Sequence, residues 1–373
     1  MLNWTFLPEE RELEADSEEA SLEIKKPDLN ASKEQNACYV SERYKQVYLP
    51  ITYSLIFILG LVLNGAVVWL SCCQTKPWSC ATIYLMNLMV ADLLYLLSLP
   101  FLVVTYLMSD TWLFGEMLCR LVRFLFYTNL YSNILLLTCI SVHRFLGVCH
   151  PLSSLPYRTR RRAWQTAAAT WTLVVLQLLP TLVYSRTKYV NGRAICYDTT
   201  SPENFDRFFA YGVVLTFSGF LFPSLIILVC YSLMVRSLTS PVENLPEAGY
   251  LARAKSIRTI LLVCSLFALC FVPYHIARFF YFVTRFRNSR DCELLSAASL
   301  AYKICRPLAS MSSCLNPILY FLSRGNNRAQ LFQKLRQNKD TTLQPDQRGS
   351  KEDAENAEEE DGNDEYQEAI AGI

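Results

Sequence analysis

The sequence has few of the residues from which catalytic and metal centres are usually built. Its 373 residues include only three histidines, and no cysteine lies at metal-ligand spacing from any of them. No nucleophile and base occur in an arrangement typical of an enzyme. The net charge of +2 gives no basic excess that would indicate a nucleic-acid partner. We therefore expect a protein that is not an enzyme and that uses no cofactor and no nucleic acid.

The N-terminal segment has no cationic stretch followed by an apolar run. We therefore expect no cleaved signal peptide, so that the first apolar helix directs the chain to the membrane. Two glycosylation sequons occur here, Asn3-Trp4-Thr5 and Asn30-Ala31-Ser32, and they matter only if this segment lies outside the cell. We predict that residues 1–48 form an extracellular, glycosylated N-tail.

Charged residues are scarce in the centre of the chain, where long apolar blocks follow one another. A helix needs about 20 apolar residues to cross about 30 Å of hydrocarbon. A soluble helical core would alternate apolar with charged faces, which these blocks do not. The sequence therefore predicts an all-α integral membrane protein, a seven-transmembrane helix bundle in 49–322. The spans are roughly 49–73, 82–108, 117–149, 164–185, 208–236, 258–284 and 295–322.

Basic residues in the short connections predict the orientation. They follow the third, fifth and seventh blocks, which end on the same side of the membrane, and basic loops are cytoplasmic. An odd number of spans then places the N-terminus outside the cell and the C-terminus in the cytoplasm, at the plasma membrane. The residues concerned are Arg158, Arg160, Arg161, Arg162, Arg253, Lys255, Arg258, Arg324, Arg328, Lys334 and Arg336.

Two segments follow the last span. Residues 323–338 combine Leu331, Phe332 and Leu335 with several cations, which is typical of a short amphipathic eighth helix on the inner membrane surface. Residues 339–373 are acidic and poor in large apolar groups, so we expect a disordered cytoplasmic tail.

Four of the fourteen cysteines fall on the predicted outer side: Cys38, Cys119, Cys196 and Cys292. An even number in an oxidising compartment predicts two disulfides, and four cysteines allow three connectivities. The spacing alone does not choose among them. The other ten lie within helices or near the cytosol, where buried thiols usually act as small apolar fillers.

Costly polar residues and prolines recur inside the seven blocks, one set to each block. Together they resemble the rhodopsin-like (class A) G-protein-coupled receptors across about residues 45–336. The residues are Asn64, Asp92, Arg144, Trp171, Pro223, Pro273 and the run Asn316-Pro317-Ile318-Leu319-Tyr320.

This resemblance implies a disulfide from Cys119 to Cys196 and contact of Arg144 with a heterotrimeric G protein on activation. It assigns activation roles to the further residues Asp92, Asn316, Pro317 and Tyr320.

The sequence also departs from the pattern of this class. His143 replaces the acid that usually precedes the arginine, so the usual ion pair restraining Arg144 is absent. Phe271 stands where a tryptophan is frequent. Asp92 and Asn316 could frame a sodium site, but Asn133 stands where a serine is usual and argues against it.

Four segments give a narrower resemblance, to the purinergic branch of receptors for extracellular ATP, ADP, UTP or UDP. They are residues 121–131 (LVRFLFYTNLY), 138–144 (TCISVHR), 196–200 (CYDTT) and 302–310 (YKICRPLAS). The resemblance implies an extracellular nucleotide as ligand, contacts from Tyr197, Asp198 and Thr199, and signalling through phospholipase C and calcium. It also implies a second disulfide, between Cys38 and Cys292.

Helix geometry independently places several cations at the outer end of the bundle. Arg123 precedes Arg144 by twenty-one residues, about 31 Å along a helix, so Arg123 lies near the outer mouth. Arg278 and Arg306 lie outward of Pro273 and Asn316 on the sixth and seventh spans. Like charges in a partly dehydrated cavity await an anion, and arginine offers bidentate donors to phosphate.

Neighbouring residues complete the predicted ligand site. Lys303 shares a face with Arg306, and His275 shares one with Arg278. We expect Tyr127, Tyr281 and Tyr302 to flank the base and ribose. The alternative is that the cations reach the interface or pair with acids such as Asp198.

Other functions are weighed against this one. A class A receptor for another anionic ligand, such as a lipid, a carboxylate metabolite or a peptide, would share most features, as chemokine receptors do. Phe126 argues against an amine ligand, because amine receptors carry an aspartate there. A channel or transporter is disfavoured, because no internal repeat relates the two halves and no polar stripe crosses the bilayer.

We expect truncation after residue 338 to leave signalling intact, because the removed tail has few hydroxyls and follows the last amphipathic segment. Ligand-evoked calcium release and surface staining, compared with the full chain, measure this. Loss of surface expression or of coupling would contradict it.

Overall fold

The computed structural model describes residues 46–73, 78–190, 192–197, 205–239, 257–258, 260–287 and 291–341, with the backbone alone for 322–341. The predicted N-tail before residue 46, with Asn3 and Asn30, and the acidic tail after residue 341 lie outside the described residues. The helices and strands are α1 Tyr48–Cys72, α2 Cys80–Leu96, α3 Leu99–Leu107, α4 Gly115–Cys149, the 3-10 turn η2 Leu155–Tyr157, α5 Arg160–Tyr184, β1 Thr187–Val190, β2 Arg193–Cys196, α6 Phe205–Thr216, the π-turn η4 Phe217–Leu221, α7 Phe222–Thr239, the π-turn η5 Phe267–Phe271, α9 Val272–Phe286 and α10 Cys292–Thr341.

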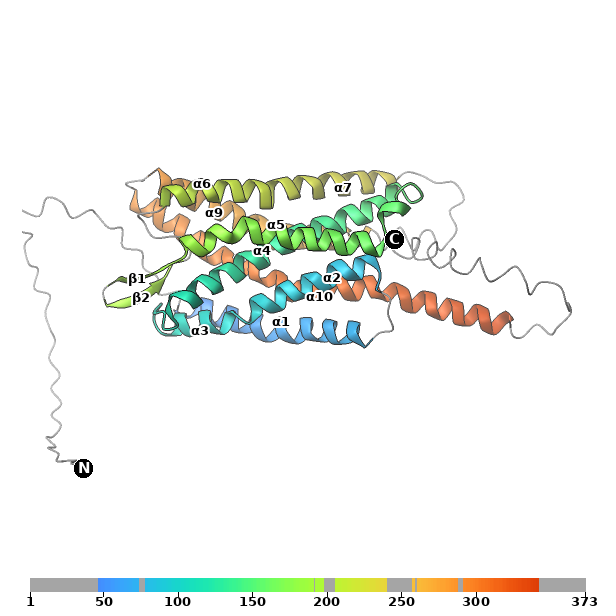
Figure 1. The fold of residues 1–373 in the computed structure, drawn as a ribbon, viewed down its shortest axis with the longest axis horizontal. Coiled ribbons are helices and arrows are strands. Elements are labelled where there is room, and N and C mark those ends of the chain that lie inside the picture. The colour runs from blue at the N-terminus through green and yellow to red at the C-terminus, as the bar shows by residue number, and fades with distance from the viewer. Residues whose placement is uncertain are drawn as a thin grey trace, which may run out of the picture. The chain divides into compact units, whose positions relative to one another are not determined.

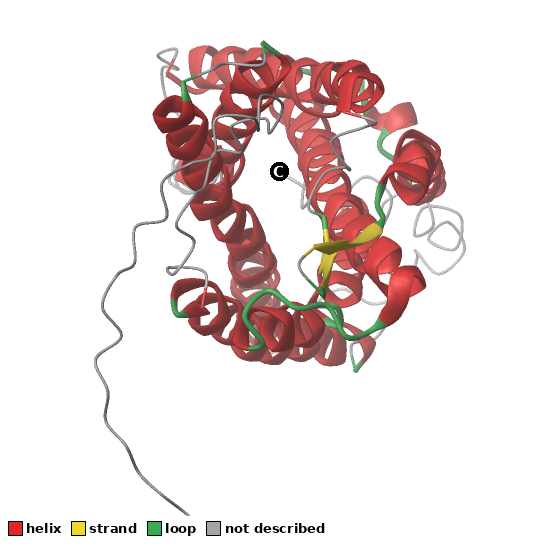
Figure 2. Ribbon diagram, turned by 90° about the vertical axis from the view of Figure 1, so that its left-hand side faces the viewer, coloured by secondary structure: helices red, strands yellow, loops and turns green. Residues whose placement is uncertain are grey.

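The predicted helix bundle is confirmed (Figures 1 and 2). Within the described part of the chain, six helical stretches are long and apolar enough to cross a membrane. They are Tyr48–Cys72, Cys80–Leu107, Gly115–Cys149, Arg160–Tyr184, Arg207–Thr239 and Ile260–Phe286. The seventh predicted span is the first part of α10, which packs against α1, α2 and α9.

The second span consists of two helices, α2 and α3, where the sequence predicts one. Pro100 lies in the first turn of α3 and has no N–H for the carbonyl of Leu96. The chain bends at Ser98, whose hydroxyl donates to the carbonyl of Tyr95 at 2.6 Å. The bend therefore replaces a backbone bond that proline removes with a side-chain bond.

Two π-turns interrupt the fifth and sixth spans, and each lies just before a proline of the same span. The N–H that Pro223 lacks would bond Gly219 in η4, and the N–H that Pro273 lacks would bond Leu269 in η5. A π-turn shifts bonding to the next carbonyl and so absorbs the missing donor. The sequence predicts the prolines within these spans but not the turns.

The last helix corrects one boundary. Residues 323–338 are helical, as expected, but they continue α10 through Thr341 and do not form a separate eighth helix. No proline follows Pro317 in this stretch, so nothing in the backbone chemistry forces the helix to end there. The location of this segment on the membrane surface stays a prediction.

The third span, α4, lies in the middle of the packing and positions the site. It packs against α2, α5 and α7, and residues on most of its turns are buried. A helix that is apolar and buried all round belongs in the interior of a bundle. Its central location lets side chains from α4 meet those of α9 and α10.

A β-hairpin covers one end of the bundle (Figure 2). Strands β1 and β2 pair antiparallel, Thr187 opposite Cys196, and Gly192 takes a φ of +75° in the connecting turn, a region that favours glycine. The predicted disulfide between Cys119 and Cys196 is confirmed and fastens the hairpin to α4. Cys38 lies outside the described residues, so its pairing with Cys292 stays a prediction.

We expect replacement of Cys119 and Cys196 together by serine to lower the melting temperature of the purified receptor. The disulfide closes a loop of 77 residues, and cross-links of this kind typically contribute about 2–4 kcal/mol. Thermal unfolding in detergent measures the shift, with Cys305→Ser, at a free thiol, as the control. An unchanged melting temperature would show that the hairpin is fixed by other contacts.

Candidate functional site

Three arginines from three helices are buried near the hairpin end of the bundle. Arg123 on α4, Arg278 on α9 and Arg306 on α10 are 3%, 1% and 2% exposed. Lys303, one turn before Arg306, is half-buried. A guanidinium at this depth loses several kcal/mol of hydration unless other groups compensate. The arrangement therefore depends on what surrounds the three side chains.

Aromatic rings surround the arginines and join them into one cluster. The guanidinium carbon of Arg306 lies 4.4 Å from the ring centre of Phe126, and that of Arg278 lies 5.1 Å from the ring centre of Tyr127. The Phe126 and Tyr127 rings pack edge to face at 5.2 Å. Cation–π contacts of this kind partly replace lost hydration.

Two tyrosines place the arginines within reach of one another. Tyr95 interacts electrostatically with Arg123 and Arg306, and Tyr274 does so with Arg278 and Arg306. The predicted convergence of cations from the third, sixth and seventh spans is thus what the structure shows for these three residues.

The hydrogen bonds of the cluster leave donors unused on one arginine. Arg123 Nη2 donates to the carbonyl of Cys196 at 2.9 Å, which ties the outer hairpin to the site. Arg278 Nη1 donates to the hydroxyl of Tyr131 at 2.6 Å. Within the described residues, Nε and Nη2 of Arg278 have no hydrogen-bond partner. An unsatisfied donor on a buried charged group costs more than the roughly 1–3 kcal/mol of a neutral one.

The other predicted ligand residues lie along the same wall. Tyr281 and Tyr302 stack at 5.3 Å with their planes 4° apart, and Tyr274 packs on Tyr302 at 5.8 Å. His275 is buried, stacks on Phe220 at 3.9 Å, and has no partner for either ring nitrogen among the described residues. These residues form a largely aromatic surface next to the cations.

The second outer loop is described only in part. Tyr197 is half-buried and donates its backbone N–H to the carbonyl of Arg186 at 3.4 Å, while Asp198 and Thr199 lie outside the described residues. The structure brings no side-chain contact of Tyr197 into view, so its role stays a prediction.

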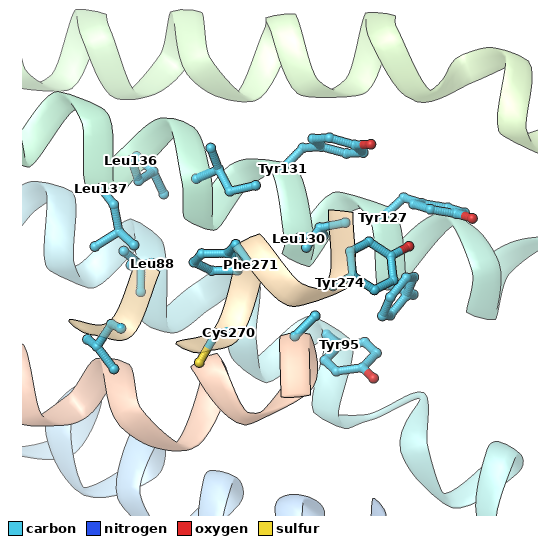
Figure 3. Close-up of a cluster of buried hydrophobic side chains, with 14 of the residues drawn as sticks. Leu88, Tyr95, Tyr127, Leu130, Tyr131, Leu136, Leu137, Cys270, Phe271 and Tyr274 are labelled. Atoms are coloured by element: carbon cyan, nitrogen blue, oxygen red, sulfur yellow. The ribbon is translucent and has the colours of Figure 1, made fainter. Parts of the chain in front are cut away.

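Sequence reasoning missed two members of the cluster, Tyr131 and Tyr274. Figure 3 shows both facing the interior with Tyr127 and Tyr95. The spacing of Tyr127 and Tyr131, four residues apart, would have placed them on one helical face. No comparable signal marks Tyr274, because it stands beside His275 in a helix that is aromatic on several sides.

The sequence matches a family model described as "7 transmembrane receptor (rhodopsin family)" over residues 63–320. The chain belongs to this family. Membership agrees with the seven helices, with the disulfide from α4 to the outer hairpin, and with the buried polar residues of the interior.

Curated relatives narrow the family to its purinoceptors, all three of the Y type. Human purinoceptor 2 is 46% identical over 77% of this chain and 76% of its own length. Purinoceptor 3 of Gallus gallus is 42% identical over 78% of the chain and 89% of its own length. Purinoceptor 4 of Xenopus laevis is 43% identical over 81% of the chain, which spans 56% of that relative.

The inner half of the receptor holds the residues expected to act in activation. Arg144 is largely buried at the inner part of α4, and the ring of the preceding His143 packs edge-on against Tyr84 at 6.2 Å. Tyr320, three residues after Pro317, accepts a hydrogen bond at 2.8 Å from Ser71 on α1. These contacts link α1, α2, α4 and α10 near one end of the bundle.

Asp92 is the centre of a dense polar network in the middle of the bundle. One carboxylate oxygen accepts from Asn129 at 2.7 Å, Asn133 at 2.9 Å and Ser313 at 2.8 Å. The other accepts from Asn316 at 2.8 Å. These donors point at the oxygens that a sodium ion needs, and an amide N–H cannot ligate a cation. The residues therefore do not fit the sodium site that the fold suggests.

We expect sodium to leave the stability of the purified receptor unchanged. A ligand that binds only the folded state raises the melting temperature in proportion to its occupancy. Melting curves in sodium chloride and in choline chloride of equal ionic strength should therefore coincide. A saturable rise specific to sodium would show that the Asn133 amide yields its place to the ion.

Proposed function

We propose that this receptor is activated by extracellular nucleotides, whose phosphates bind Arg278, Arg123, Arg306 and Lys303. The observation that carries the proposal is Arg278, a fully buried guanidinium with two N–H donors unused in the described structure. An anion with several oxygens satisfies such donors with charge-assisted hydrogen bonds. The relatives are named purinoceptors, which supports a nucleotide as the anion's source.

The aromatic wall supports a nucleotide over a simple anion. Tyr281 and Tyr302 stack on each other beside the cations, and Tyr274 joins them. Aromatic faces bind a planar base through offset stacking, while their hydroxyls offer hydrogen bonds to a sugar. A phosphate group held by the arginines leaves the base and ribose to this surface.

Activation follows if the bound anion favours one arrangement of the outer helix ends. A ligand shifts a conformational equilibrium only by its different affinity for the two states. Phosphate shared by Arg123, Arg278 and Arg306 favours the state in which α4, α9 and α10 approach one another. The sixth span, kinked at Pro273, then moves outward at its inner end and exposes Arg144 to a G protein, with signalling through phospholipase C and calcium.

This function also requires an orientation. The cation cluster lies at the hairpin end of the bundle, and an extracellular ligand reaches it only if that end faces outward. The basic connections predicted at the opposite end would then face the cytoplasm.

We expect Arg278→Ala and Arg306→Ala each to raise the nucleotide concentration needed for half-maximal calcium release by about 10–100-fold. One charge-assisted hydrogen-bonded contact is worth roughly 1.5–3 kcal/mol. ATP, ADP, UTP and UDP are tested on one transfected cell line with matched surface expression. Arg120→Ala is the control, because Arg120 lies one turn from Arg123 and pairs with Glu116 outside the site.

Unchanged potency of all four nucleotides in both variants would overturn the assignment of the site. Responses to anionic lipids, peptides or carboxylates in place of nucleotides would keep the receptor but change its ligand.

A further inference from the structure

Tyr131 links the buried arginine of the sixth span to the fifth span. Its side chain is fully buried, its hydroxyl accepts from Arg278 Nη1 at 2.6 Å, and its ring packs on the backbone of Gly219 in η4. No other described side chain hydrogen-bonds Arg278. One tyrosine thus connects three helices at the base of the cation cluster.

The hydroxyl of Tyr131 fixes which edge of Arg278 faces the cluster. It holds Nη1, and the two nitrogens with no partner in the described structure are Nε and Nη2. These two N–H groups lie side by side on one edge of the planar guanidinium, and that edge gives parallel bonds to two phosphate oxygens. The contacts with Tyr127 and Phe282, at 5.1 and 5.0 Å, hold the plane from its faces.

Gly219 determines where the ring of Tyr131 can lie. A Cβ atom at this position would lie 2.5 Å from Cδ1 and 2.6 Å from Cε1 of the ring. An aromatic ring cannot bend to relieve such a contact, so the whole side chain would have to move. The glycine is not needed for its backbone, because among the described glycines only Gly115 and Gly192 have positive φ. Packing against Tyr131 is therefore what requires a residue without a side chain.

The fifth span is itself held in place at this point. Phe220, the residue after Gly219, stacks on His275 at 3.9 Å and on Phe267 at 5.8 Å with planes 3° apart. Phe267 begins the second π-turn, η5. Because the two π-turns pack on each other, Gly219 cannot retreat freely from a larger side chain, and Tyr131 must give way.

We propose that Tyr131 is a positioning residue for the anion and that Gly219 sets the affinity for phosphate without touching it. Tyr131 holds Arg278 so that its Nε and Nη2 edge is presented, and Gly219 provides the space that keeps Tyr131 there. This inference rests on the proposed function, because it assumes that Arg278 binds the phosphates.

The test is a double-mutant cycle between the two residues, read as direct nucleotide binding to membranes in which the G protein is uncoupled. Tyr131→Phe keeps the ring and removes the hydroxyl, and we expect it to weaken binding about tenfold. Gly219→Ala should weaken binding at least as much. In a Tyr131→Ala background, Gly219→Ala should add less than about twofold, because the ring that it displaces is gone.

Gly65→Ala on α1 is the matched control, since a Cβ there meets no atom within 4 Å. It should bind nucleotide as the unmodified receptor does. If Gly219→Ala fails to reach the surface, the double variant with Tyr131→Ala should restore expression, and failure to do so counts against the proposal.

The outcomes separate this inference from the function on which it rests. If Arg278→Ala leaves binding unchanged, the proposed site is wrong. If Arg278→Ala weakens binding but Tyr131→Phe does not, or if Gly219→Ala has its full effect without the Tyr131 ring, only the positioning role is wrong.

Discussion

The burial of Arg278 is the constraint around which the outer half of this receptor is arranged. A guanidinium 1% exposed keeps its charge only if neighbours replace its water. Tyr131 supplies one hydrogen bond, and Tyr127 and Phe282 supply ring faces. These groups stabilise the cation without neutralising it, so the site retains a strong preference for an anion.

The same side chains connect the ligand site to the helices that move in our proposal. Tyr131 packs into the π-turn before Pro223, and that turn packs through Phe220 on the π-turn before Pro273. π-turns arise here because each proline lacks the N–H that its helix would use. A conformational change at Arg278 therefore meets the two places where the backbone of the fifth and sixth spans is least regular. Farther inward, the network around Asp92 joins α2, α4 and α10 through amide donors.

Sequence reasoning predicted the spans well, because crossing a membrane imposes a length and a composition that single segments display. It also placed Arg123, Arg278 and Arg306 at one level, because helical rise converts spacing into depth. It missed the break at Ser98 and both π-turns, because a proline permits several local solutions and neighbouring helices choose among them. It placed a separate helix at 323–338, where α10 continues, because apolar periodicity reports an amphipathic face but not a change of direction.

The sequence by itself determined that this chain crosses the membrane as helices, that its outer third holds several arginines, and that it resembles the purinergic receptors. Each of these follows from residue type and spacing along one helix. Only the tertiary structure decided which arginine keeps unused donors, which ring holds it, and why position 219 must lack a side chain. These are contacts between helices far apart in sequence, and a ring carbon 2.5 Å from an absent Cβ leaves no trace in local pattern.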